Sequence, residues 1–292
     1  MVSEACRDLL IDAQRFSAKY GGGFFNHLPM ALVALDKLGA DEARLRAFVA
    51  SYAPHLRLKS DAERALTERR GLAEVLPELS DGIASQAFHG LIRVAYAVES
   101  GVDEEIPDAL GAWKFGYSAL PDAGEERFAT FGDAFAAIAD DERLPHTFEG
   151  GSIDGRIARV VALPAFAEYG VANVDLREIA LLSARVFVAG GDFTALHMVT
   201  ACHAMRLLGP FLAPRALHVF ARAILAAYVT IGRPSPAAPA GVALPDDATL
   251  AARVLPSDDE HDLKLVYSAL REEAEYGSRW HRLGAAVRLG LA

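Results

Sequence analysis

The sequence predicts an all-α protein, a single multi-helix globular domain over residues 1–292 that encloses a central pocket. Three observations favour this fold class. Apolar residues recur at helical spacing along most of the chain, alternating strand patterns are nearly absent, and 52% of the 292 residues are hydrophobic. This apolar content is enough for a sizeable core and too high for a disordered chain.

Helix start and stop signals divide the first half of the chain. An apolar stripe stops at Gly39, a residue type that favours the position just past a helix end. Asp41 can cap the helix that follows, and Pro54 comes after the last apolar residues of that helix. The expected helical ranges are 30–38, 41–53, 60–76, 84–99, 108–120 and 128–138.

The second half continues the helical pattern around one interruption. Asp192 can cap a strong helix that Gly209 and Pro210 close. The Pro-rich stretch 232–247 excludes regular structure and is predicted to be a loop over the same domain. The other expected helices are 156–163, 175–188, 192–208, 216–231, 248–255, 258–276 and a short terminal one that ends near residue 289.

Charge and cysteine content exclude several classes of partner. Thirty-nine acidic and 29 basic residues give a net charge of −10, whereas nucleic-acid binding needs clustered Lys and Arg. The same charge disfavours an anionic membrane surface, and no apolar stretch reaches the roughly 20 residues that span a bilayer. Cys6 and Cys202 make no disulfide framework, and the N-terminus lacks the order of a signal peptide. We expect a cytoplasmic protein that binds neither nucleic acid nor membrane.

Common catalytic motifs are absent from the sequence. There is no G-x-G-x-x-G after a strand, no G-K-[ST] loop, no G-x-S-x-G and no H-E-x-x-H. The remaining candidates are nine histidines, several of which lie inside strongly apolar helices. A hydrogen-bonded core residue is the more common role of any single buried histidine, but imidazole is also a preferred ligand of iron, zinc and copper. Several histidines that converge in one helical domain would therefore indicate a metal site.

Helical spacing sorts these histidines. His261 and Lys264 are three residues apart, about 4.5 Å along the helix axis, so both side chains can reach one point. His197 and His203 are six residues apart, with a rotation of about 240° between them, which is poor for sharing one metal on a straight helix. By spacing alone, His203 is a poorer candidate than His261 for a ligand of a shared metal site.

A polar stripe on the apolar helix around His89 predicts that this helix lines a cavity. Gln86, Arg93 and Tyr96 lie on the stripe, and Gly90 permits the close approach of a ligand. We expect Arg93 and Tyr96 to be catalytic residues, with Arg93 binding a phenolate or carboxylate. The alternatives are a salt bridge to a helix acid for Arg93 and an ordinary place in the core for Tyr96.

Four stretches, each with at least one histidine, follow one another along the chain. They are 24–35 (FFNHLPMALVAL), 88–99 (FHGLIRVAYAVE), 191–206 (GDFTALHMVTACHAMR) and 258–267 (DDEHDLKLVY). Together they resemble the questin oxidase-like family, whose best-known members act on anthraquinone-type polyketides in fungi. The stretches occur in the family's order and span most of the chain.

The resemblance implies oxygen chemistry on an aromatic or quinone substrate, either Baeyer–Villiger-type insertion or oxidative ring cleavage. It implies O2 and a small aromatic molecule as partners, with NADPH as the reductant for an insertion. It also implies a mononuclear non-haem Fe(II) centre held by histidines and a carbamylated lysine. Carried over to this chain, the metal ligands are His27, His89, His197, His203, His261 and Lys264. Aromatic side chains that can form the flat walls of the pocket are Phe24, Phe25, Tyr96, Trp113 and Phe193.

The sequence leaves two alternatives open. Five histidines are more than a four-histidine site requires, so one of them lies outside the site, and Lys264 has an alternative role as a surface lysine paired with acids such as Glu260. For the whole protein, the alternative to an oxygenase is a non-catalytic helical small-molecule-binding protein with a structural or vestigial metal site. Metal content and oxygen uptake separate these two functions.

Overall fold

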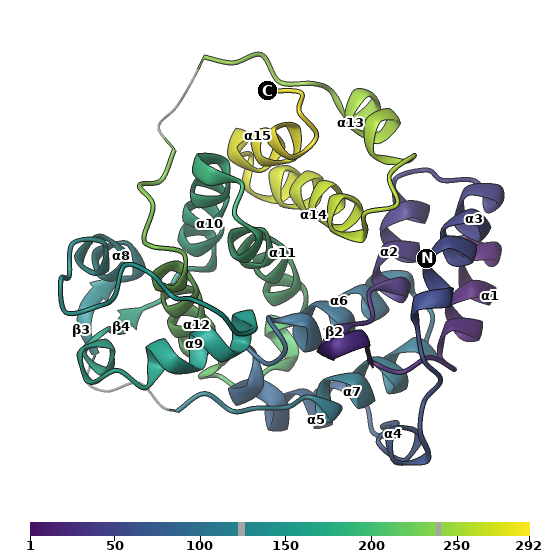
Figure 1. The fold of residues 1–292 in the computed structure, drawn as a ribbon, viewed down its shortest axis with the longest axis horizontal. Helices are drawn as coiled ribbons and strands as arrows, with labels where there is room; N and C mark the ends of the chain where they lie inside the picture. Colours follow the sequence, from purple (N-terminus) through teal and green to yellow (C-terminus); the bar gives the residue numbers. More distant parts are fainter. Residues whose placement is uncertain (122–125, 238–240) are drawn as a thin grey trace.

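The computed structural model describes residues 1–121, 126–237 and 241–292 (Figure 1). Within these ranges the chain forms 15 α-helices, several short 3-10 turns and two small two-stranded sheets, which confirms the all-α prediction. Buried apolar side chains from the first helix to the last pack into one contiguous core. In the same ranges, no helix combines the length and apolar character needed to cross a bilayer.

The N-terminal part contains two predicted helices and one, α1, that the sequence pattern did not predict. Gly39 follows α2 with a φ of +96°, and the Asp41 carboxylate accepts a hydrogen bond from the Arg44 N–H at the start of α3. The short strands β1 and β2 pair antiparallel just before α2. The elements in order are α1 (Glu4–Ala13), β1 (Lys19–Tyr20), β2 (Phe24–Phe25), α2 (Leu28–Lys37) and α3 (Glu42–Tyr52).

The prediction of one helix over 60–76 is wrong, because the structure divides it into α4 (Asp61–Ala65) and α5 (Leu72–Leu79). Between these helices, the Glu68 carboxylate accepts hydrogen bonds from the backbone N–H groups of the next two residues. Those N–H groups are therefore not available to continue the helical ladder. A side chain that offers the backbone other partners favours a turn over a helix.

The buried helix predicted over 84–99 begins five residues later, as α6 (His89–Ser100). The residues before it, Gln86, Ala87 and Phe88, have φ values of +55°, +58° and +68°. Three consecutive non-glycine residues thus adopt the left-handed conformation, at a cost of roughly 1–2 kcal/mol for each. Such conformations persist only where the surrounding structure holds them, and they cluster at functional sites.

The middle of the chain contains a strand pair that the sequence pattern did not predict. β3 pairs parallel with β4, so the helix predicted from residue 128 begins only at α8, where the Thr130 hydroxyl accepts a hydrogen bond from the Asp133 N–H. The helix predicted over 108–120 lies earlier, as α7. The elements here are α7 (Glu105–Phe115), β3 (Glu126–Thr130), α8 (Phe131–Ala139), α9 (Ile153–Val161) and β4 (Gly170–Asn173).

The C-terminal helices confirm their predictions to within a few residues. Side chains cap the starts of all of them except α12, and the expected cap at Asp192 is confirmed, because its carboxylate accepts hydrogen bonds from two backbone N–H groups of α11. They are α10 (Leu176–Gly190), α11 (Phe193–Leu208), α12 (Ala216–Thr230), α13 (Asp247–Val254), α14 (Glu260–Tyr276) and α15 (Arg279–Arg288). The predicted loop 232–247 has no helix or strand in 232–237 and 241–246, and its residues 238–240 lie outside the described residues.

Helices from distant parts of the chain pack together and position the site (Figure 1). α11 contacts both α6 and α14, and α2 contacts the same two helices from another side. The N-terminal, middle and C-terminal parts of the sequence therefore meet in one place. The elements that converge there are the ones that carry the histidine-containing stretches.

Candidate metal centre

Four imidazole rings lie together where α2, α6, α11 and α14 meet. One ring nitrogen from each of His27, His89, His197 and His261 lies within 4.8 Å of the corresponding nitrogens of the other three. The Nε2 atoms of His27 and His89 are 2.7 Å apart, and those of His89 and His197 are 3.2 Å apart. Two nitrogens bound to one ion at about 2.1 Å lie about 3 Å from each other, so these spacings suit ligands of a shared ion.

The beginning of a helix places each of these imidazoles. His27 directly precedes α2, where the Asn26 side-chain oxygen accepts a hydrogen bond from the N–H of the first helical residue. His89 opens α6 after the left-handed turn, and His261 lies in the first turn of α14. His197 is the fifth residue of α11. Because three of the rings lie on helices and the fourth directly precedes one, the packing of the helices holds the cluster in place.

Backbone carbonyls fix the orientation of two of the rings. His89 Nδ1 donates a hydrogen bond to the carbonyl of Gln86 in the left-handed turn, and His197 Nδ1 donates to the carbonyl of Phe193 at 2.7 Å. A proton on Nδ1 leaves the lone pair on Nε2 free to bind a cation. The strained turn before α6 therefore has a direct effect on the cluster, because it presents the carbonyl that orients His89.

Glu260 lies beside the other two rings. One of its carboxylate oxygens is 3.5 Å from His27 Nδ1 and 3.6 Å from His261 Nδ1, and an oxygen of Asp259 is 3.3 Å from the same nitrogen of His261. A carboxylate behind an imidazole holds the proton on the outer nitrogen and raises the basicity of the inner one. Glu260 was not among the site residues that we expected from the sequence.

All four histidines are held in the neutral form. Burial is the main cause that lowers the pKa of each ring, and the nearby charge of Lys264 lowers the pKa of all four further. The neutral imidazole is the form that binds a metal ion. The electrostatics of the cluster thus match those of a ligand set.

Lys264 is completely buried next to these rings. Its Nζ atom has no hydrogen-bond partner among the described residues, and burial lowers its pKa to about 7. The alternative of a surface lysine is therefore wrong. An unpaired ammonium in the core is unfavourable, so this side chain requires a neutral amine, a covalent change or a bound group.

The donor set fits a metal ion. His261 Nε2 and Lys264 Nζ are both buried polar atoms without a partner among the residues that the structure describes, and Lys264 is near enough for its charge to act on all four rings. Buried polar groups are almost always paired, so their lack of partners indicates a group that belongs there. Several imidazoles with at most one anionic ligand suit iron, zinc or copper rather than magnesium or calcium.

His203 lies outside the cluster, which corrects the expectation that it is a metal ligand. Its Nδ1 is 2.8 Å from a Glu272 oxygen, and its Nε2 is 3.0 Å from a Glu99 oxygen. Both ring nitrogens are thus occupied by carboxylates. The physical reason is the six-residue spacing from His197, which turns the two rings toward different neighbours of α11.

Arg93 and Tyr96 also lie away from the cavity beside the cluster, which corrects the expectation that they are catalytic. The Arg93 guanidinium is buried in an ion pair with Glu105 at 2.5 Å, so the salt-bridge alternative holds. The Tyr96 hydroxyl donates to the backbone carbonyl of Lys264 at 3.2 Å and lies 3.1 Å from the Ser268 hydroxyl. The predicted cavity lining by this stripe is thus confirmed for Gln86, which lines the cavity beside His89, whereas Arg93 and Tyr96 connect α6 to α7 and α14.

A cavity of about 740 Å³ opens against the histidine cluster. The Phe25 ring stacks on the His89 ring at 4.9 Å, and the Phe193 ring lies 4.6 Å and 4.7 Å from the rings of His197 and His261. The expected aromatic walls Phe24, Phe25 and Phe193 line this cavity, together with Tyr20. Its volume lies in the usual range for a small-molecule site.

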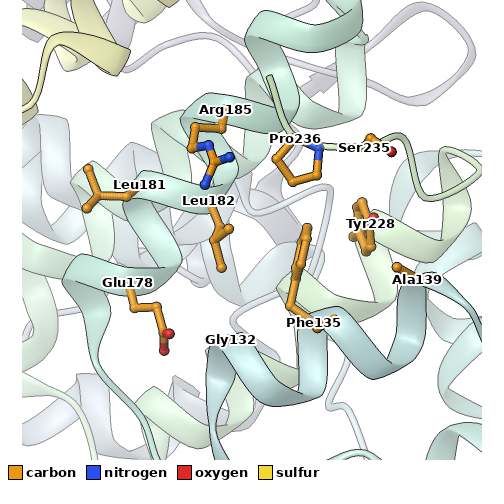
Figure 2. Close-up of a pocket in the computed structure, with 11 residues that line it drawn as sticks. Gly132, Phe135, Ala139, Glu178, Leu181, Leu182, Arg185, Tyr228, Ser235 and Pro236 are labelled. Atoms are coloured by element: carbon orange, nitrogen blue, oxygen red, sulfur yellow. The ribbon is translucent and has the colours of Figure 1, made fainter. Parts of the chain in front are cut away.

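A second cavity lies away from the histidine cluster and has no histidine in its lining. Figure 2 shows this pocket of about 500 Å³ between α8, α10 and α12. The stacked rings of Phe135 and Tyr228 form one side, and Glu178 and Arg185 are the charged residues in its lining. It has no histidine in its lining, so we assign the chemistry to the cavity beside the cluster.

The fold and this site define a class of protein. It is a helical bundle in which four clustered imidazoles, three of them buried, could hold a metal ion beside an aromatic cavity of the size that binds a small molecule.

Comparison with protein families gives a more specific assignment. The chain belongs to the Questin oxidase-like family, whose model matches residues 70–269. The matched range includes every candidate ligand except His27. No curated protein matches the chain. Family membership makes the protein an oxidoreductase, of a kind that acts on anthraquinone-like small molecules.

Proposed function

We propose that the protein is a non-haem iron oxygenase, in which four histidines and Lys264 hold a single Fe(II) ion. The observation that carries this proposal is the cluster of four neutral imidazoles, whose ring nitrogens lie within 4.8 Å of one another. Membership of an oxidase family supports iron over zinc, because zinc has no redox chemistry. The proposed ligands are His27, His89, His197, His261 and Lys264.

We further propose that Lys264 becomes a carbamate. The neutral amine attacks carbon dioxide, forms an N–C bond and releases one proton, which leaves an anionic oxygen donor in place of an ammonium. A pKa near 7 keeps a large share of the amine neutral at physiological pH. The anion would offset part of the charge of the ion, whereas an ammonium in the same place would repel it.

In this proposal, bound iron would activate O2. The residues of the chain position the substrate and keep bulk water away from the reacting centre. The cavity walls hold a planar polycyclic substrate against the cluster, with Phe193 beside His197 and His261. The Gln86 and Phe193 carbonyls hold protons on the outer nitrogens of His89 and His197, and the Glu260 carboxylate lies 3.5 Å from His27 Nδ1. Burial of the rings excludes bulk water from the reacting centre.

Two reactions on such a substrate remain as alternatives within the proposal. Baeyer–Villiger-type insertion places one oxygen atom in the substrate and reduces the other to water, so it consumes two electrons from a reductant, for which we propose NADPH. Oxidative ring cleavage by a dioxygenase places both atoms in the product and needs no reductant. The chain has no nicotinamide-binding fingerprint, so NADPH would act as a diffusible reductant.

Metal analysis and oxygen uptake test this function. We expect the purified chain, after anaerobic addition of Fe(II), to hold stoichiometric iron and to consume O2 with an anthraquinone-like substrate. A dependence of uptake on NADPH identifies insertion, and independence identifies ring cleavage. Failure to bind iron would instead favour a non-catalytic small-molecule-binding protein.

We place the protein in the cytoplasm, and its cysteines support this proposal. Cys6 and Cys202 are both buried and unpaired. Free thiols of this kind are typical of a reducing compartment.

A further inference from the structure

Two cations, Arg156 and Lys19, line the cavity beside the histidine cluster, and neither forms an ion pair with a carboxylate among the described residues. Arg156, in the second turn of α9, lines this cavity together with Phe24, Phe193 and the imidazoles. Among the described residues, no carboxylate forms an ion pair with it within 4.0 Å, although Asp154 and Glu260 line the same cavity. A guanidinium forms its strongest hydrogen bonds with carboxylates and phosphates, so Arg156 lacks the kind of partner that suits it best among the described residues.

Hydrogen bonds hold this guanidinium in place without neutralising it. One Nη atom donates to the Thr194 hydroxyl at 3.0 Å, and the other donates to the Gly151 carbonyl at 3.3 Å. A guanidinium has five N–H groups, so three remain, and the Nε atom has no partner among the described residues. Both contacts are neutral, so the full positive charge remains available to a ligand.

The contact with Thr194 ties Arg156 to the aromatic wall. Thr194 follows Phe193 in the first turn of α11, and the Phe193 ring lies against two of the clustered histidines. Phe193 is 49% exposed and Phe24 is 69% exposed, although both are large apolar side chains. Exposed apolar groups around a cavity mark a ligand site.

We propose that Arg156 is the anion-binding residue of this cavity, and that the ligand is a planar aromatic carboxylic acid. The carboxylate would pair with the guanidinium, and the ring system would lie on the exposed faces of Phe24 and Phe193. A carboxylate matches the fork of N–H groups better than a neutral carbonyl or a single hydroxyl does. The polycyclic ring system of this ligand is taken from the proposed function. The new part of the inference is that the substrate carries a carboxylate and that this group binds at Arg156.

Equilibrium binding of two matched probes tests the proposal. Anthraquinone-2-carboxylate and anthraquinone-2-carboxamide have nearly the same shape and differ in charge. We expect the full-length protein to bind the carboxylate roughly 10- to 100-fold more tightly, as measured by titration calorimetry. The titration is made on metal-free and on iron-loaded protein, because a carboxylate could also bind the metal, and the metal-free measurement isolates the guanidinium.

Two arginine positions on α9 test whether Arg156 causes the preference for the carboxylate probe. Arg156→Gln should bind both probes equally, and Arg156→Lys should keep part of the preference. Arg159→Gln is the matched control, because Arg159 lies three residues further along α9, donates to the Glu149 and Gly150 carbonyls, and does not line the cavity. Thermal unfolding of each variant shows whether it is folded.

Three results would overturn the proposal. They are equal affinity of the wild-type protein for the two probes, no binding of either probe at about 1 mM, and a preference that survives in Arg156→Gln. A preference that disappears in Lys19→Gln but not in Arg156→Gln would likewise assign the anion to the other cation in the lining. Because the titrations of metal-free protein need neither iron nor turnover, a failure to bind iron would refute the proposed function while the preference for the carboxylate could still be measured.

Discussion

His203 and Glu272 form a fully buried hydrogen bond, with 2.8 Å between Nδ1 and Oε1. On the other side of the ring, Nε2 lies 3.0 Å from a Glu99 oxygen. Although burial alone would lower it, hydrogen bonds to the two carboxylates raise the pKa of His203 above its ordinary value of 6.5. The two carboxylates favour the protonated ring, and the three side chains join α6, α11 and α14, which are the helices that carry His89, His197 and His261.

Replacement of this imidazolium should destabilise the fold and leave metal binding intact. In His203→Gln, Glu99 and Glu272 lose the positive partner that they share, although Glu272 keeps its ion pair with Arg206 at 2.7 Å and Arg271 stays 4.0 Å from Glu99. Loss of hydrogen bonds to charged groups of this kind costs about 1.5–3 kcal/mol in the free energy of unfolding. Urea unfolding measures this loss. Iron binding should stay stoichiometric at temperatures where the variant is folded, since His203 is not a ligand. A folded His203→Gln protein without iron would contradict this assignment.

The loss of unfolding free energy in His203→Gln should depend on pH. The folded pKa of His203 lies above 6.5, so its stabilising effect is complete below pH 6.5 and is lost as the pH rises through the folded pKa. Burial alone would raise the pKa values of Glu99 and Glu272, but the contact with His203 lowers both below 4.5. The stability that these two carboxylates contribute is therefore lost only when the pH falls below 4.5. The stability difference between wild type and His203→Gln should therefore be larger at about pH 5.5 than at about pH 8.5. A difference that grows as the pH rises would disprove the charged triad.

His89→Ala should abolish iron binding in a folded protein. His89 Nε2 lies between the Nε2 atoms of His27 and His197, so its loss removes the central donor of the cluster. His55→Ala is the matched control, because that imidazole bonds only the Tyr52 carbonyl and lies outside the cluster. Metal analysis and circular dichroism check both variants. Full iron occupancy in His89→Ala would show that His89 is not a ligand.

Lys264→Ala should weaken iron binding by about 10-fold or more, because it removes the proposed anionic donor. Acetate or bicarbonate should partly restore the affinity, since the vacated space is buried next to the imidazoles and can take a small carboxylate. Lys37→Ala serves as the control, as this amine donates to the Met1 carbonyl at the surface. Unchanged iron affinity in Lys264→Ala would show that the lysine does not bind the metal.

A glycine substitution in the left-handed turn should stabilise the fold, and one in the helix after the turn should destabilise it. Ala87 has a φ of +58°, so Ala87→Gly relieves backbone strain and should stabilise the protein by about 0.5–1 kcal/mol. Ala97→Gly, in the regular part of α6, should destabilise it by about 1 kcal/mol or more through lost helix propensity and a lost buried methyl group. Urea unfolding of the two variants compares them directly. Destabilisation of similar size in both would argue against strain in the turn.

Much of the fold was predictable because its signals are local. Asp41, Asp192 and Gly39 mark helix ends through hydrogen bonds and φ values that involve only neighbouring residues. The left-handed turn before α6 was not predictable, because distant residues hold it. A Cβ at Gly116 would overlap the Gln86 side chain, so the turn depends on a glycine at the end of another helix.

The site was predictable in part. The histidines of the cluster were named through a family resemblance, and helix spacing correctly marked His203 as the outlier. Spacing could not show which partners a polar stripe meets, so Arg93 was assigned to catalysis although Glu105 on α7 pairs with it. Arg156 carried no signal at all, because the absence of an ion partner is a property of the folded chain.

The rings of His27 and His261 are 4.7 Å apart, yet they come from opposite ends of the sequence. Closing so long a loop carries an entropic cost that is recovered only after the intervening helices have docked. The complete ligand set therefore arises late, and a ribosome-bound or partly folded chain lacks it. An ion that needs all four rings binds only fully folded chains and therefore stabilises the folded state by mass action. The metal content of a preparation would then report the fraction of chains that have reached the native state.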